Sequence, residues 1–383
     1  MAAMGGAEGL GNKSIELLVN FFGSAKAAWS AETSELFKTG VRKNALGAFI
    51  EFRIKHPDAP ENLLNYCDRH KINLCCINDE DYPPILKEIN SPPMFFYYRG
   101  KLEPLAQRIG IVGTRHNTSY GQSVALELGE QLAAAGLTVV SGAARGIDTF
   151  AHRGALKSGR TVAVMGCGIN YIFPRENKRL LDQIIERGVV LSEFPPQMKP
   201  NQGTFPQRNR IIAGLCKGVI VVEANFKSGA LLTSTYAGNY GRDVFAVPGQ
   251  VYAAMSRGCH DLIRDGATLI KNAQDVLDEY NIKTTNKIKS EFDAATLFDS
   301  MTPIKNAQDI NQICAADKKP IELDGTAAEV FEIIPSNEFI TADEILERLD
   351  KITPSELQNV MLELEIKGYI SEDAGRYTRK IGG

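Results

Sequence analysis

Short apolar runs alternate with helical patterns through the middle of the chain. From Arg108 onward the runs are RIGIVG, TVVSG, TVAVMG, VVLSEF, GVIVVEA and DVFAVPG, and each ends in Gly, Ser, Glu or Pro. Strands that are apolar on both faces and are joined by helices belong to parallel sheets covered on both sides. The pattern therefore predicts an α/β fold with a doubly wound parallel sheet over residues 108–280.

Two other patterns precede this region. Residues 13 to about 70 have helical periodicity interrupted by glycines and prolines, which predicts a small helical domain over residues 1–75. The stretch DYPPILKEINSPPMFFYYRG, with two Pro-Pro pairs and an aromatic run, predicts a connector over residues 76–107 held against a larger body. We expect its tyrosines to serve packing rather than chemistry.

The C-terminal part begins with a polar, weakly periodic stretch, residues 281–324, that is typical of a linker. Three amphipathic helical patterns with Thr and Ser as helix caps follow within residues 325–383, and SEDAGRYTRK then suggests a turn between two short strands. Three helices and a small hairpin predict a winged helix.

Composition narrows the class of protein. The chain has 383 residues, 44% of them hydrophobic, and a formal net charge of −3, which suits two or three domains. No apolar run approaches the roughly 20 residues that span a bilayer, and the N-terminus lacks a signal pattern, so we expect a cytoplasmic protein without membrane contact. Seven scattered cysteines indicate reduced thiols.

Known cofactor motifs are incomplete. No CxxC or HExxH occurs, so we expect no metal. The GCG at 166–168 lacks the third glycine of a dinucleotide fingerprint. GALKSGRT at 154–161 imitates a phosphate loop, but it precedes a strand instead of following one. We expect no bound cofactor.

The segments after the strands carry unusual residues. In open parallel sheets, ligands bind beyond the carboxyl ends of the strands. Five of these tips contain small residues and four contain arginine; between residues 108 and 181 there are nine Lys or Arg against four Asp or Glu. Tight turns explain a single glycine, and solvated helix faces explain part of the charge. The whole set indicates a groove for anions.

Phe205 stands among these cations in the stretch FPQRNRIIAG. A phenylalanine just before a helix most often belongs to the core or forms a hydrophobic staple. An aromatic ring among arginines, glycines and serines is also what a single-strand binder uses to stack a base. Both interpretations stay open.

Three carboxylates at strand ends or helix starts are candidates for a general base: Asp148, Glu193 and Glu223. For Asp148, capping the helix is the more common role. His152 has no Ser or Cys nucleophile nearby, so we expect His152 to be structural. Ser228 and Gly229 either cradle a phosphate or cap a helix. No catalytic residue is assigned.

Five motifs in a fixed order, IVGTR, SGAARGIDTFAH, FPQRNRIIAG, SGALLTSTYA and VFAVPGQ, resemble the DprA/Smf family of DNA-processing proteins. The likeness extends over nearly the whole chain, including a SAM-like or helix-hairpin-helix N-terminal module and a winged helix at the end. The chain has Ala143 and Ala230 where the family often has Leu and Ser.

The resemblance implies an extended Rossmann fold that binds and protects single-stranded DNA, forms a homodimer and loads the RecA recombinase during natural transformation, with no established catalysis. By position it implies that Arg115, Arg208, Arg210 and the Lys227 to Gly229 segment contact phosphates, and that Phe205 stacks a base. The full set of candidate DNA-binding residues is Gly113, Arg115, Ser141, Gly142, Arg145, Arg175, Lys178, Phe205, Arg208, Asn209, Arg210, Lys227, Ser228 and Gly229.

A dimer interface is expected near the last strand, because an edge strand must be paired or covered. Its candidate residues are Leu262, Ile263 and Leu269.

Two alternatives belong to other functional classes. Related Rossmann proteins hydrolyse nucleoside monophosphates through a PGGxGTxxE tip, which this chain lacks. A duplex-DNA regulator would act through the winged helix, but residues 321–380 hold fourteen Asp or Glu against six Lys or Arg. That balance would repel duplex phosphates and favours protein contact.

Overall fold

The computed structural model describes most of the chain. The described residues are 1–201, 203–282, 325–335, 340–349, 352–366, 369–373 and 376–379. They belong to two compact units, Met1–Lys289 and Ser290–Gly383. The predicted linker lies outside the described residues apart from Asn281 and Ile282.

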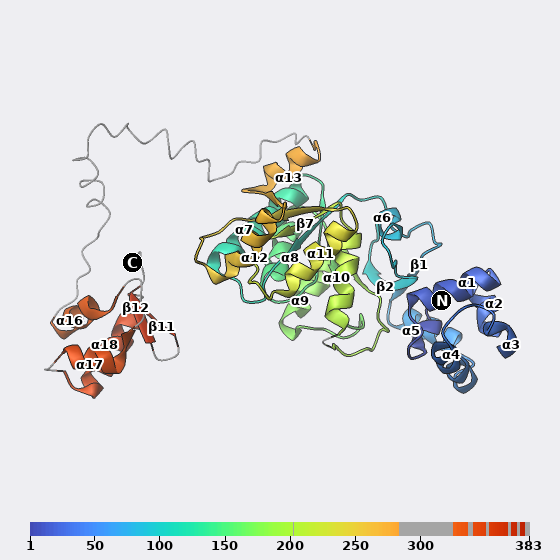
Figure 1. Ribbon diagram of the computed structural model, residues 1–383, viewed down its shortest axis with the longest axis horizontal. Helices are drawn as coiled ribbons and strands as arrows, with labels where there is room; N and C mark the ends of the chain where they lie inside the picture. The colour runs from blue at the N-terminus through green and yellow to red at the C-terminus, as the bar shows by residue number, and fades with distance from the viewer. Residues whose placement is uncertain are drawn as a thin grey trace. The chain divides into compact units, whose positions relative to one another are not determined.

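A nine-stranded sheet organises the first unit (Figure 1). Its strands are β1 (Asn73–Cys76), β2 (Phe95–Gly100), β3 (Arg108–Val112), β4 (Thr138–Ser141), β5 (Thr161–Val164), β6 (Val189–Ser192), β7 (Gly218–Val221), β8 (Asp243–Ala246) and β9 (Thr268–Leu269). They lie in the order β1-β2-β6-β5-β4-β3-β7-β8-β9. Strands β3 to β8 are the six predicted runs, and all neighbours from β6 to β9 pair in parallel. The doubly wound α/β fold is thus confirmed.

The sheet begins earlier than the sequence pattern indicated. Strands β1 and β2 pair antiparallel with each other, and β2 pairs antiparallel with β6. The segment expected to be a connector therefore supplies β2, and β1 crosses the predicted boundary at residue 75. The aromatic run supplies the packing: Tyr82 and Tyr97 are almost fully buried.

Helices cover both faces of the sheet (Figure 1). They are α6 (Pro84–Lys87), α7 (Ser119–Ala134), α8 (Ile147–Ser158), α9 (Lys178–Arg187), α10 (Thr204–Gly214), α11 (Gly229–Asn239), α12 (Arg257–Arg264) and α13 (Ala273–Glu279), with two 3-10 turns at Arg175–Asn177 and Ala254–Ser256. Side chains of α7, α8 and α13 share a core with Ile109 and Ile111 of β3. Those of α10, α11 and α12 share a second core with Val112. This alternation along β3 is the period of two that a strand imposes.

The first residues form a helical layer beside the β1-β2 end of the sheet. It contains a 3-10 turn (Met4–Gly6) and the helices α1 (Asn12–Phe22), α2 (Ala25–Ser30), α3 (Thr33–Leu36), α4 (Lys43–Lys55) and α5 (Ala59–Arg69). Leu18, Leu46 and Phe49 are fully buried, and their cluster is continuous with Phe95 of β2. The expected N-terminal helices are present and pack on the sheet.

The second unit contains the three predicted helices and the predicted strand pair. Its elements are α16 (Thr326–Ile333), β10 (Ile340–Thr341), α17 (Ala342–Arg348), α18 (Pro354–Ile366), β11 (Ile370–Asp373) and β12 (Arg376–Arg379). The strands form a sheet in the order β10-β12-β11 over a core that includes Val330, Ile345 and Leu364. Thr341 caps α17 in a capping box with Glu344.

Within the described part of the chain, no helix is long and apolar enough to cross a membrane. The same residues contain no group of three or more His, Cys, Asp or Glu side chains placed to hold a metal ion. The six described cysteines are free thiols.

Candidate nucleic-acid interface

The strand order places a crevice at the carboxyl edge of the sheet. The chain leaves β3 toward β4 on one side and leaves β7 toward β8 on the other, so the connections diverge between these neighbouring strands. Ligands of doubly wound sheets bind at such a point, since neither connection covers it. Helix α10 also begins at this edge.

A cavity of about 760 Å³, here called the Phe205 groove, opens at this point. It is lined by the tips that follow β3, β4, β5, β6 and β7. Eight of the fourteen candidate DNA-binding residues line it: Gly113, Arg115, Phe205, Arg208, Asn209, Lys227, Ser228 and Gly229. The fold thus brings these eight candidates together around one cavity.

Arg115 and Phe205 form the central pair of the Phe205 groove. The exposed Arg115 guanidinium carbon lies 5.2 Å from the centre of the half-buried Phe205 ring. A cation over an aromatic face is held there by the quadrupole of the ring while its N–H groups stay free for an anion. Neither side chain alone would supply both charge and a flat apolar surface.

The N-terminus of α11 forms another wall of the groove. Ser228 caps this helix, because its hydroxyl accepts a hydrogen bond from the Ala230 amide at 3.3 Å. Asn209 donates to the Gly229 carbonyl at 3.3 Å and thereby ties α10 to this wall. Exposed Lys227 precedes the cap. The positive end of the helix dipole and a lysine therefore face the same groove.

The floor of the groove is a buried charged pair. Arg208 is only 4% exposed and donates to the Val164 carbonyl, and it interacts electrostatically with buried Asp148. Its Nε finds no acceptor among the described residues. Arg115 lies close enough to repel Arg208, a repulsion that an anion in the groove would relieve. Arg208 is therefore a buried residue that lines the floor of the groove, whereas Arg115 is exposed.

Asp148 organises the loop after β4. Its carboxylate accepts from the amides of Gly142 at 3.1 Å and Ala144 at 3.3 Å. Burial raises the pKa of Asp148, while Arg208 and these amide donors oppose the shift. Its role is structural, but it does not cap α8: the N-cap is Gly146, with no side-chain capping bond, and the Asp148 carboxylate binds loop amides instead of helix amides.

His152 is fully buried one turn later on α8. The Ala143 amide donates to Nε2 at 3.3 Å, so Nδ1 carries the proton and donates to Thr161 Oγ1 at 2.7 Å. Burial, and secondarily Arg208, lowers the pKa of His152 to about 3. It is a neutral core residue, as expected.

Arg210 lies outside the Phe205 groove, contrary to expectation. Its guanidinium donates to Glu193 Oε2 at 2.6 Å and to the Ser91 carbonyl at 2.7 Å, and its side chain is 12% exposed. Successive helical residues turn by about 100°, so Arg208 and Arg210 point to opposite sides of α10. A carboxylate already neutralises Arg210.

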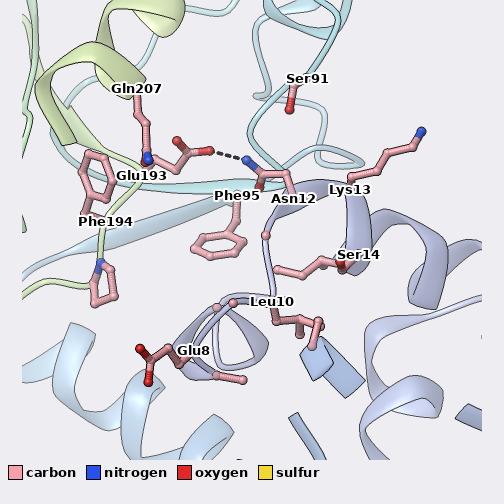
Figure 2. Close-up of a pocket in the computed structure, with 18 of the residues that line it drawn as sticks. Glu8, Leu10, Asn12, Lys13, Ser14, Ser91, Phe95, Glu193, Phe194 and Gln207 are labelled. Atoms are coloured by element: carbon pink, nitrogen blue, oxygen red, sulfur yellow. Dashed lines mark hydrogen bonds between the residues drawn. The ribbon is translucent and has the colours of Figure 1, made fainter. Parts of the chain in front are cut away.

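That side of α10 faces a second cavity of about 1130 Å³, here called the Glu193 cavity (Figure 2). The first turn of α1 lies across it, and Figure 2 shows the Asn12 side chain directed at Glu193, with a hydrogen bond of 2.6 Å. Asn12 also accepts from the Met94 amide at 3.1 Å. Glu193 therefore links Asn12 of the helical layer to Arg210 of α10, which covers the sheet.

Five other candidates, Ser141, Gly142, Arg145, Arg175 and Lys178, also lie away from the groove lining. Ser141 and Gly142 are buried, and the Ser141 hydroxyl donates to the Ile111 carbonyl at 2.7 Å. Gly142 has no room for a side chain because a Cβ there would lie 2.0 Å from Arg208 Nη1. These two positions end a buried strand and support the floor. Arg145 is exposed and pairs with Glu176.

Arg175 and Lys178 line a smaller, separate cavity of about 390 Å³. Both are exposed, and Lys178 Nζ lies 3.0 Å from Asp182 Oδ2 in an ion pair. The loop after β5 thus carries its own cations beside the main groove.

Glu223, the third candidate base, is buried and accepts from the Thr118 amide at 2.9 Å and from the Thr118 hydroxyl. It fixes the start of α7.

Among the groove residues that sequence reasoning did not single out as DNA contacts are His116 and Phe173. His116 directly follows Arg115, and Phe173 precedes a proline in a tip that the sequence had already marked as unusual. Their proximity to predicted residues was the available signal.

Comparison with known proteins agrees with this architecture. The family model described as DNA recombination-mediator protein A matches residues 73–281. A protein Smf from Synechocystis sp. is 35% identical, over 79% of this chain and 79% of its own length. The DNA processing protein DprA of Bacillus subtilis is 39% identical, over 66% of this chain and 88% of its own length.

Solved structures give the same result. DprA from Streptococcus pneumoniae superposes with a TM-score of 0.65 at 36% identity, covering 73% of this chain and 98% of that structure. DprA from Helicobacter pylori, described for its single-stranded DNA binding mode, gives a TM-score of 0.50 at 28% identity. This match covers 55% of this chain and 96% of that structure. The match spans the sheet, its edge loops and the tip motifs, and the chain belongs to the DNA recombination-mediator protein A family, also called DprA/Smf.

Proposed function

We propose that this chain binds single-stranded DNA along the Phe205 groove and acts in DNA recombination without catalysing a reaction. The observation that carries the proposal is the Arg115 guanidinium over the Phe205 ring, in a cavity that also holds Lys227 and the start of α11. Phosphates need the cations and the helix N-terminus, whereas bases need the flat apolar surface. The single-stranded DNA binding mode described for the Helicobacter pylori relative supports the same ligand.

Gel-shift assays with single-stranded and duplex DNA at two salt concentrations test this proposal. The groove offers rings to bases, which are accessible only when unpaired, so we expect preference for the single strand. Affinity should fall as salt rises, because phosphate contacts release counterions. Equal or stronger duplex binding would contradict the proposal.

We further propose that the bound strand is protected and passed to the RecA recombinase during natural transformation, in the cytoplasm. This part depends on the family resemblance. A strand-exchange assay with purified RecA tests it. On DNA already coated by a single-strand binding protein, the full chain should accelerate strand exchange, because RecA filaments form faster. No acceleration would remove RecA loading from the proposal.

The chain should act as a homodimer. Leu269 is 44% exposed on β9, the last strand of the described sheet, while Leu262 and Ile263 of α12 are partly buried against the adjacent core. An open edge next to apolar side chains favours pairing with a second copy. Ile263→Glu should give monomers in size-exclusion chromatography, and a persistent dimer would place the interface elsewhere.

We propose that the C-terminal unit is a winged helix that contacts a protein rather than duplex DNA. Helix α18 exposes Glu356 and Glu365, and Glu356 also accepts hydrogen bonds from Thr353 at the helix start. Like charge would weaken contact with a phosphate lattice. Deleting residues 321–383 should leave single-strand affinity unchanged or slightly higher; a tenfold loss would contradict this assignment.

The hydrolase alternative has less support. Asp148, Glu193 and Glu223, the candidate bases, are each engaged in contacts that hold the fold. Incubation with nucleoside monophosphates tests it, since release of free base at enzymatic rates would revive this alternative.

A further inference from the structure

The aromatic surface that the Phe205 groove offers to a ligand is concentrated on Phe173. Phe205 is half-buried, with the Arg115 guanidinium over its ring. The ring also lies against Gly166, where an added Cβ would be 2.6 Å from Phe205 Cδ1. Phe173, by contrast, is 40% exposed.

The two rings are neighbours. Their centroids are 5.7 Å apart and their planes are inclined by 46°. Phe205 therefore supports Phe173 from within the cavity, and both rings line it. Aromatic pairs in this arrangement stabilise each other, and Phe173 stays 40% exposed within the pair.

The loop that carries Phe173 is anchored at both ends. On one side Asn170 donates from its amide to the Pro196 carbonyl at 3.0 Å and from its side chain to Tyr66 Oη at 2.6 Å. On the other side Asn177 donates to the Ala143 carbonyl at 3.0 Å and to Thr149 Oγ1 at 2.9 Å. A ring held exposed by a fixed loop loses little conformational freedom when a ligand binds.

The same loop also carries positive charge. Ile172, adjacent to Phe173, lines the smaller cavity together with Arg175 and Lys178. A strand that leaves the Phe205 groove over Phe173 would meet these cations next.

We propose that Phe173 stacks a base of the bound single strand and that Arg175 and Lys178 hold the phosphates that follow it. This inference rests on the proposed function. It extends the binding path from the Phe205 groove over the loop at 170–178, and it gives Phe205 the role of positioning Arg115 and supporting Phe173.

Replacing Phe173 in the full chain and measuring binding of a fluorescent oligo-dT by anisotropy tests the stacking. Phe173→Ala and Phe173→Leu should each weaken binding by about tenfold, because both lack a π face, whereas Phe173→Tyr should bind like wild type. Phe37, which is 51% exposed, supplies the matched control, and Phe37→Ala should have no effect. Wild-type affinity in the Phe173→Leu variant would overturn the stacking, since leucine keeps only the apolar contact.

A strand with abasic sites separates stacking from phosphate binding. The difference between wild type and Phe173→Ala should disappear on this strand, while Arg115→Ala should still weaken binding. An undiminished Phe173→Ala effect on the abasic strand would contradict the inference. If wild type fails to bind oligo-dT at all, the proposed function itself is wrong; if wild type binds and Phe173→Ala binds equally well, only this inference is wrong.

Strand length tests the cations beyond Phe173. Arg175→Ala should weaken binding of an oligo-dT of about 20 nucleotides and leave one of about 4 nucleotides unaffected, because a short strand occupies the groove alone. An equal effect of Arg175→Ala on both lengths, or no effect on either, would contradict the extended path.

Discussion

Helix α10 separates two cavities whose arginines are in different states. In the Phe205 groove, Arg115 is exposed and held only over an aromatic ring. In the Glu193 cavity, Arg210 is 12% exposed and bound to a carboxylate that Asn12 also contacts. The first arginine is available to a ligand, and the second joins parts of the fold.

The difference arises from the rotation of one helix. Arg208 and Arg210 are two residues apart, which is about 200° around the helix axis. Arg208 turns toward Asp148 beneath the groove, and Arg210 turns toward Glu193. The number of cations in a stretch of sequence is therefore not the number that can bind phosphate.

The largest effect on stability should come from Arg208, at the floor of the Phe205 groove. Arg208→Met should lower the free energy of unfolding by about 3 kcal/mol, because Asp148 would stay buried without its cation. Urea unfolding of the full chain measures this. Gln207→Met, at the adjacent exposed position, should change stability by less than about 0.5 kcal/mol. If Arg208→Met lowers the free energy of unfolding as little as the control does, Arg208 does not stabilise the fold and its charge serves a ligand instead.

Arg210→Ala should destabilise the fold by about 2 kcal/mol, since Glu193 would keep only Asn12 as a partner. Lys178→Ala is the matched comparison, because the pair with Asp182 is exposed on both sides and should contribute less than about 1 kcal/mol. Both values come from urea unfolding. Equal losses in the two variants would show that the Glu193 contacts do not join the fold as described.

The buried His152 predicts a pH dependence with a definite sign. Its pKa is about 3 when folded against 6.5 in the unfolded chain, so between these values the unfolded state binds more protons. Stability should therefore fall as pH falls below about 6.5, by about 1.4 kcal/mol per pH unit from this group. The free energy of unfolding, measured at pH 5 and pH 6, should therefore change less between these two pH values in His152→Gln than in the wild type. Parallel slopes would mean that His152 is already charged in the fold.

The smallest effect concerns Phe205. Phe205→Leu should remove about 1 kcal/mol of binding free energy by releasing Arg115 from its ring. The salt dependence of binding should stay nearly unchanged, since a ring displaces few counterions. Anisotropy titrations at three salt concentrations measure both quantities. A flatter salt dependence would show that Arg115 loses its phosphate contact without the ring.

Much of the fold was predictable because each of the six parallel strands has an apolar run with a polar or glycine end. Strands β1 and β2 were not recognised, because they are not part of the repeated pattern: β2 pairs with the distant strand β6, and β1 pairs only with β2. Within the site, Arg115 and Lys227 were found by motif. The burial of Ser141 and the pairing of Arg210 could not be, because each depends on a partner distant in sequence, Ile111 and Glu193.

The salt dependence of oligo-dT binding by Arg115→Ala and Arg210→Ala, measured side by side, tests the central claim most directly. We predict that Arg115→Ala lowers affinity by about tenfold and reduces the slope of log affinity against log salt by about 0.7, as expected for one lost phosphate contact to a single strand. Arg210→Ala should keep both the affinity and the slope of the wild type. The opposite pattern, with Arg115→Ala unchanged and Arg210→Ala weakened, would place the DNA in the Glu193 cavity and contradict the account.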